Sequence, residues 1–180
     1  MKRTLLMIIL ALSASLGAWA QVKIDGIYYN LNEEAKTAEV IKPLFANDYM
    51  TNYSGDIVIP ASVTYEGKDY IVTSLGSSAF SAFYDITSIA LPTSLTNIGK
   101  SAFANCNGLS ALEIPDGVKT IGESAFLGCQ YLTSIVIPNS VDSIGRGAFQ
   151  YCRGLVSVKF GSGLKSVGRT ELISQRLFFR

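Results

Sequence analysis

The chain has 180 residues, 48% of them hydrophobic, with 15 Lys and Arg against 14 Asp and Glu. This length and apolar content indicate one domain or a short repeat array with a buried core, and they exclude an intrinsically disordered chain. The nearly balanced charge, without a basic block, gives no electrostatic basis for binding nucleic acid or an anionic membrane surface.

Residues 1–20 have the pattern of a secretory signal peptide. A basic start is followed by an apolar run from Leu5 to Leu16 and by small residues at the positions that precede cleavage. The apolar run is shorter than the roughly 20 residues of a membrane-spanning helix, although an uncleaved N-terminal anchor is the alternative. Cleavage after Ala20 leaves 13 bases and 14 acids, a net charge of −1. We therefore expect an exported protein, located at the cell surface, in the periplasm or in the extracellular space.

Residues 21–52 are expected to form an N-terminal β cap. Two β-rich runs, Ile27–Leu31 and Ala38–Ile41, surround the turn-forming residues Asn32–Ala35, and this arrangement predicts a β-hairpin. A repeat stack needs such a cap, because its first coil otherwise presents an apolar face to water. A short separate binding module is the alternative for this segment.

Residues 53–168 contain a repeat with a period of 23 residues. An Ala-Phe pair returns at every step, in phase with apolar-Gly and apolar-Pro pairs. The Ala-Phe pairs are Ala79-Phe80, Ala102-Phe103, Ala125-Phe126 and Ala148-Phe149. A unit of 23 residues cannot bury its own apolar edge, so we expect successive coils to stack with equivalent side chains in continuous apolar columns.

Each part of one unit has an expected structural role. Leu112 and Ile114 alternate with outward positions as in a half-buried strand, which Pro115 ends because it has no N–H to donate. Gly122 is expected to adopt a positive φ in a tight turn. Ala125-Phe126 places a small residue beside a large one, so that neighbouring coils approach while the ring fills the interior.

The repeat resembles the BspA-like class of leucine-rich repeats in its pattern, L-x-x-I-x-I-P-x-x-V-x-x-I-G-x-x-A-F-x-x-C. The usual sequence of that family is closely matched by the segment LTSIVIPNSVDSIGRGAF. In the first copy an insertion, about Thr64 to Val72, contains Glu66-Gly67-Lys68, which are expected to form a hairpin turn. The resemblance implies a mainly β repeat solenoid of the leucine-rich-repeat type, with short turns or 3₁₀-helical segments on the convex side. The family is common on exported and surface proteins of Bacteroidetes-type bacteria, so it also implies a binding or adhesive role.

Residues 169–180 depart from the repeat, because Glu171 and Leu172 occupy the Ala-Phe positions. This irregular tail is expected to be either a short helix that covers the last coil or the remnant of a truncated or frame-shifted longer array. A remnant would leave Val158 and Phe160 poorly covered, and self-association through that end would follow.

The residues of the chain give little support for catalysis. Without any His, the commonest general base and metal ligand are missing, together with Ser-His and Cys-His catalysis. Cys106, Cys129 and Cys152 follow the repeat period rather than a metal-binding spacing, so we expect a column of buried thiols. A disulfide between adjacent coils is the alternative, since an exported protein meets an oxidising environment. We predict no enzymatic activity, no metal and no cofactor.

The outward positions of each strand are the candidate partner-binding residues. They are Ser88, Ala90, Ala111, Glu113, Ser134, Val136, Ser157 and Lys159. This small, nearly uncharged face is either a binding surface or an ordinary exposed sheet face. The leading hypothesis is a non-enzymatic protein-binding or adhesion module whose ligand is a host or bacterial surface protein. The alternative is a structural spacer or assembly unit.

Overall fold

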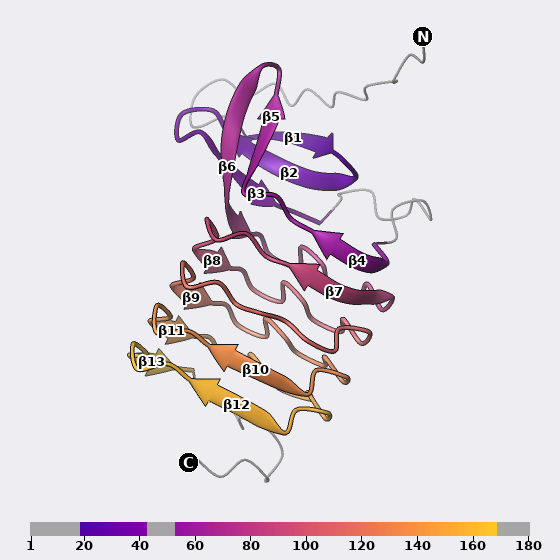
Figure 1. Ribbon diagram of the computed structural model, residues 1–180, viewed down its shortest axis with the longest axis vertical. Coiled ribbons are helices and arrows are strands. Elements are labelled where there is room, and N and C mark those ends of the chain that lie inside the picture. Colours follow the sequence, from indigo (N-terminus) through magenta and orange to yellow (C-terminus); the bar gives the residue numbers. More distant parts are fainter. Residues whose placement is uncertain (1–18, 43–52, 169–180) are drawn as a thin grey trace.

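The computed structural model describes residues 19–42 and 53–168, which form a stack of coils with antiparallel strands at one end (Figure 1). Each coil crosses the stack twice, so the stack has a row of longer strands and a row of short strands. The longer strands are β4 (Gly55–Val58), β7 (Ile86–Ala90), β10 (Ser134–Ile137) and β12 (Ser157–Phe160). The short strands are β8 (Asn97–Ile98), β9 (Thr120–Ile121), β11 (Ser143–Ile144) and β13 (Ser166–Val167).

Turns, and no helix, join these strands throughout the described part of the chain. The sequence left open whether the convex side is built of turns or of 3₁₀-helical segments, and the structure has turns there. The solenoid of the leucine-rich-repeat type is confirmed.

The parallel pairing follows the 23-residue period. In the short row Ile98 pairs with Ile121, and Ile121 pairs with Ile144. The longer row is less regular, because β10 pairs with β12 but the preceding coil joins β10 only through a single bridge from Glu113 to Val136. The strand predicted before Pro115 is therefore reduced to a single bridge at Glu113. The coil has Ser110, Ala111 and Leu112 where β10 and its flank have Thr, Ser and Ile, so it has fewer β-branched side chains to favour a strand.

The predicted N-terminal hairpin is present. β2 (Ile27–Asn32) pairs antiparallel with β3 (Thr37–Val40), and β3 then pairs in parallel with β6 (Lys68–Leu75). A third strand, β1 (Trp19–Ile24), pairs antiparallel with β2 and was not predicted. The strand order β1-β2-β3-β6-β8 extends the short row beyond the first coil, so the hairpin covers that end of the stack.

The predicted signal peptide falls outside the described residues, apart from Trp19 and Ala20, which belong to β1. Cleavage after Ala20 would leave Gln21–Ile24 to pair with β2 in the same register. The predicted tail, residues 169–180, also lies outside the described residues.

The inserted segment of the first copy forms the expected hairpin. β5 (Ser62–Tyr65) pairs antiparallel with the first half of β6. Glu66 and Gly67 connect the two strands with φ of 50° and 73°. A two-residue turn with positive φ at both positions is of the kind that matches the twist of the flanking strands.

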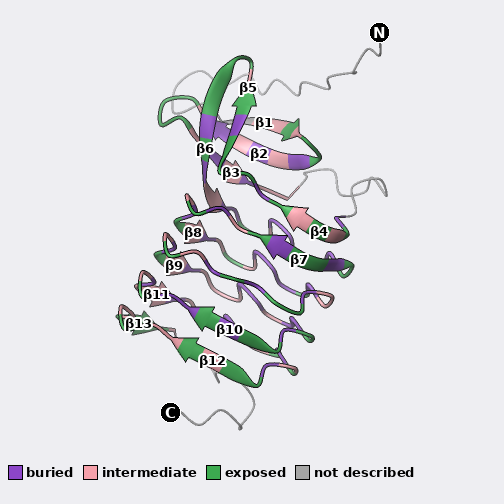
Figure 2. Ribbon diagram, viewed as in Figure 1, coloured by how far each residue is buried: buried purple, intermediate pink, exposed green. Residues whose placement is uncertain are grey.

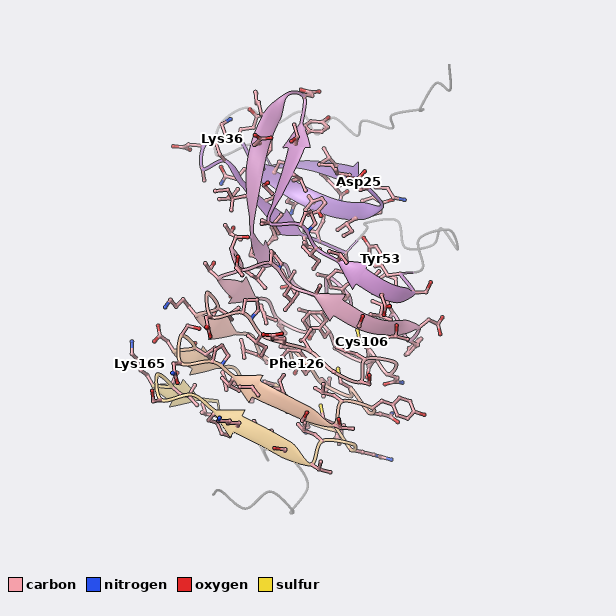
Figure 3. The ribbon with its side chains drawn as sticks, viewed as in Figure 1. Asp25, Lys36, Tyr53, Cys106, Phe126 and Lys165 are labelled. Carbon is pink, nitrogen blue, oxygen red and sulfur yellow. The ribbon has the colours of Figure 1, made fainter. Side chains whose placement is uncertain are left out.

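A column of phenylalanine rings runs through the core between the two rows of strands, where Figure 3 shows Phe126. Phe80, Phe103, Phe126 and Phe149 are each fully buried. Their rings are nearly parallel, at centroid separations of 5.7, 5.2 and 5.2 Å. Tyr53 covers the first ring at 5.3 Å, and its hydroxyl accepts a hydrogen bond from the Tyr28 backbone N–H. The predicted apolar columns are therefore present, and the column is joined to the N-terminal strands through Tyr53.

The prediction of a positive φ at Gly122 is wrong, because the positive φ occurs two residues later, at Ser124, with 55°. Gly122 is required for a different reason. A Cβ atom there would lie 2.6 Å from the carbonyl carbon of Gly99, the equivalent residue of the preceding coil. Gly145 is similarly close to the backbone N of Glu123, at 2.3 Å. The recurring glycine lets adjacent coils pack backbone against backbone.

Candidate protein-binding surface

The longer strands present one exposed face, which we call the strand face: the outward residues of β4, β7, residues 110–114, β10 and β12 (Figure 2). It arises because buried and exposed residues alternate along these strands, as in the exposed-buried-exposed-buried order of β10. All eight predicted residues are exposed on it. They are Ser88, Ala90, Ala111, Glu113, Ser134, Val136, Ser157 and Lys159.

The pairing register places these residues in two columns. Ser134 lies beside Ser157 in one column, and Val136 lies beside Lys159 in the other. Glu113 bridges to Val136, so the second column continues into the preceding coil. The structure thus brings the predicted residues together on one face.

The part of this face that β4 contributes was not predicted from the sequence. Asp56 and Val58 of β4 lie beside Ser88 and Ala90, so each column begins one coil earlier than predicted. Pro60 was the signal, because it aligns DIVIP with the repeat motif SIVIP and makes Val58 equivalent to Val136. Val58 and Val136 are 71% and 57% exposed on this face, and Val156, directly before β12, is 75% exposed.

Asp56 is fixed by its neighbours at the first edge of the face. Its Oδ1 accepts hydrogen bonds from the hydroxyls of Ser88, at 2.6 Å, and Thr87, at 2.8 Å. These two hydrogen bonds lower the pKa of Asp56 below its usual value, so the carboxylate is charged at neutral pH.

A shallow groove of about 450 Å³ lies at the other end of the strand face. Glu113 and Asp116 lie on one side, Lys159 on the other, and Val136 between them, with Pro138 and Phe160 also lining the groove. The three charged residues are exposed, and no ion pair joins any of them to another described residue.

Other charges of the stack are paired across adjacent coils. Glu123 lies 3.5 Å from Lys100 and 3.2 Å from Arg146, and Asp142 lies 2.9 Å from Lys165. Lys165 lies at the outer edge of the short row (Figure 3). These exposed pairs contribute little stability, but they neutralise charge along that edge.

The cysteine column is a structural feature. Cys106, Cys129 and Cys152 are buried free thiols, and each Sγ donates a hydrogen bond of 2.9–3.1 Å to a carbonyl of the preceding coil. Burial raises the pKa of Cys106 to about 12, so the nucleophilic thiolate does not form at neutral pH. The neighbouring Cys152 thiol, together with burial, also raises the pKa of Cys129.

No three or more His, Cys, Asp or Glu side chains of residues 19–42 and 53–168 are grouped so that they could hold a metal ion. In the same residues there is no helix with the length and apolar character needed to cross a membrane.

The fold and the strand face define a leucine-rich-repeat solenoid. Residues 51–175 match the family described as "BspA type Leucine rich repeat region", in six copies. The chain belongs to this family, as the resemblance implied. None of the curated proteins matches it.

Similar solved structures are bacterial leucine-rich-repeat proteins. A leucine-rich repeat protein from Bacteroides capillosus is 32% identical with a TM-score of 0.65, and the match covers 78% of this chain and 97% of that one. A leucine rich cell surface protein from Faecalibacterium prausnitzii is 27% identical with a TM-score of 0.60, over 83% of this chain and 45% of that one. The pneumococcal vaccine antigen PcpA, at 22% identity and a TM-score of 0.63, shares the fold over 83% of this chain and 40% of its own length.

Proposed function

We propose that this protein is an exported, non-enzymatic module that binds other proteins through its strand face and acts in adhesion at the bacterial cell surface or in the extracellular space. The observation that carries the proposal is the strand face itself. It is a continuous surface with exposed valines on β4, on β10 and beside β12. Leucine-rich repeats generally serve protein–protein interaction, and one similar structure is a cell surface protein.

The absence of enzymatic activity is part of this proposal. The sequence has no His, and Cys106, Cys129 and Cys152 are each at most 2% exposed, so a substrate does not reach their thiols. These residues offer no activated nucleophile. The strand face offers contact area and few charges, which suits recognition of a protein surface.

Capture by the immobilised protein tests the proposal. The probes are purified extracellular-matrix proteins and a surface-protein fraction from bacteria. Glu113→Lys and Lys159→Glu, each alone, should weaken capture, whereas Arg153→Glu, an exposed charge reversal at a turn outside the strand face, should not. Capture that is the same for all variants would refute a role for this face.

Export is tested separately by mass spectrometry of the protein recovered from the cell surface and the culture medium. The signal-peptide pattern predicts that the recovered chain begins at Gln21. A protein found only in the cytoplasm with residues 1–20 intact would contradict export and would leave the binding proposal standing.

A second candidate function, an assembly unit, is favoured by the last described coil. Val158 is only partly buried, and Val167 is 41% exposed. The equivalent Ile135 and Ile144 of the preceding coil are each 2% exposed. Apolar side chains left exposed at one end of a stack favour association through that end. Sedimentation tests it: self-association should rise with concentration and should be lost in Val167→Lys, and a monomer at every concentration would contradict it.

A further inference from the structure

We propose that the groove on the strand face binds an extended segment of a partner protein that carries a basic, an apolar and an acidic side chain at alternate positions. This inference rests on the proposed function, and it specifies the chemistry of the partner at that same surface.

The first argument comes from charges that the fold keeps apart. Glu113 bridges to Val136, and Val136 pairs with Lys159, so the acidic and the basic residue lie two strands apart. At about 4.8 Å per strand their backbone positions are roughly 10 Å apart, and no ion pair between described residues joins the two side chains. Val136, an uncharged side chain, occupies the position between them. A charged residue at that position could have paired with Glu113 or with Lys159.

The same stack shows what happens where opposite charges occupy adjacent coils. Glu123 pairs with Lys100 and Arg146, and Asp142 pairs with Lys165. Along the short row the repeat therefore brings the charges together. At the groove, Glu113 and Asp116 on one side and Lys159 on the other remain available to a partner. Their order selects a partner segment with the complementary order of charges.

The second argument comes from the apolar centre of the groove. Val136 is 57% exposed, and Pro138 and Phe160 line the groove beside it. A volume of about 450 Å³ is within the range of sites that take small ligands or a few side chains. An apolar side chain of the partner would cover Val136 and remove its surface from water.

The third argument comes from the geometry of an extended chain. Side chains two residues apart on an extended strand point to the same side and lie about 6.8 Å apart. Three alternate residues therefore span roughly 14 Å, and long basic and acidic side chains bend inward to reach charges roughly 10 Å apart. A segment with the order basic, any, apolar, any, acidic fits these spacings.

Titration of the isotope-labelled protein with three synthetic nonapeptides, followed by nuclear magnetic resonance, tests the inference. The peptides are GSKSVSEGS, with both charges, GSKSVSKGS, with two bases, and GSESVSEGS, with two acids. Each exposed ion pair contributes about a twofold to fivefold change in affinity. The peptide with both charges should therefore bind about fivefold more tightly than either of the others, with shifts of the backbone amide signals of Val136, Asn139 and Gly161.

Two variants make the test specific. Lys159→Glu turns the groove acidic at both ends, so the peptide with two bases should become the tightest ligand. Arg153→Glu changes the net charge equally but lies outside the groove, and it should leave the order of affinities unchanged.

Equal affinities of the three peptides, no binding of any, or an unchanged order in Lys159→Glu would overturn the inference. The capture experiment separates this failure from failure of the proposed function. Partner capture that is weakened by Glu113→Lys but accompanied by equal peptide affinities would refute only the charge order of the groove.

Discussion

Truncation of Phe126 is the most direct test of the column on which the stack depends. The Phe126 ring is fully buried, with neighbouring rings at 5.2 Å on both sides, from Phe103 and Phe149. Replacing a fully buried Phe by Ala costs about 3–5 kcal/mol, because apolar burial is lost and a cavity remains. Whole domains are stable by only about 5–15 kcal/mol, so Phe126→Ala should remove a large part of the free energy of unfolding. Phe149→Ala should cost about 1 kcal/mol less, since in the described column Phe149 has a ring neighbour on one side, Phe126.

Urea unfolding followed by circular dichroism measures these differences. Tyr131→Ala is the matched control, because it also removes an aromatic ring but from a site that is 67% exposed, and it should change the free energy of unfolding by less than about 0.5 kcal/mol. If Phe126→Ala were as stable as Tyr131→Ala, the column would not hold the coils together and the account of the fold would be refuted.

Four further predictions concern other parts of the stack. Gly145→Ala places a Cβ 2.3 Å from the Glu123 backbone N and should lower the free energy of unfolding by about 1–3 kcal/mol, measured as a lower urea midpoint. An unchanged midpoint would contradict close backbone packing. Hydrogen bonding to Arg146, with the nearby Lys100 charge, lowers the pKa of Glu123 below its ordinary 4.5. Its contribution to stability is therefore present above pH 4.5 and lost as the pH falls through the lowered pKa. The loss of stability over this pH range, measured by urea midpoints, should be smaller in Glu123→Gln. Tyr53→Phe removes the acceptor for the Tyr28 N–H and should cost about 1 kcal/mol of unfolding free energy. A thiol reagent should label Cys106 only after unfolding, whereas rapid labelling of the native protein would contradict its burial.

The repeat period predicted the burial pattern well, because a fixed spacing assigns each residue type to one position in the coil. Phe126, Cys129 and Ile144 are buried as their positions required. The position of Val58 on the strand face could also be predicted from the sequence, but only by aligning its motif with the repeat through Pro60 despite the inserted hairpin.

Other features depend on contacts that a one-dimensional period does not contain. Gly122 was assigned a positive φ because turns often require one, whereas the structure uses it for contact with Gly99 of the preceding coil. The groove was not predicted for the same reason. It depends on Glu113, Val136 and Lys159 lying in one line across three coils, and only the register of the strands establishes that line.

The hairpin at one end gives the stack a direction of growth. Because β2 and β3 pair antiparallel and only β3 continues into the parallel short row, the N-terminal end is occupied by a different kind of structure. Duplication of 23 residues within the repeat adds one coil whose neighbours are almost the same as before, without altering the hairpin. Gene duplication can therefore lengthen such a protein in steps of one coil, and each step adds another row of outward residues on which selection can act.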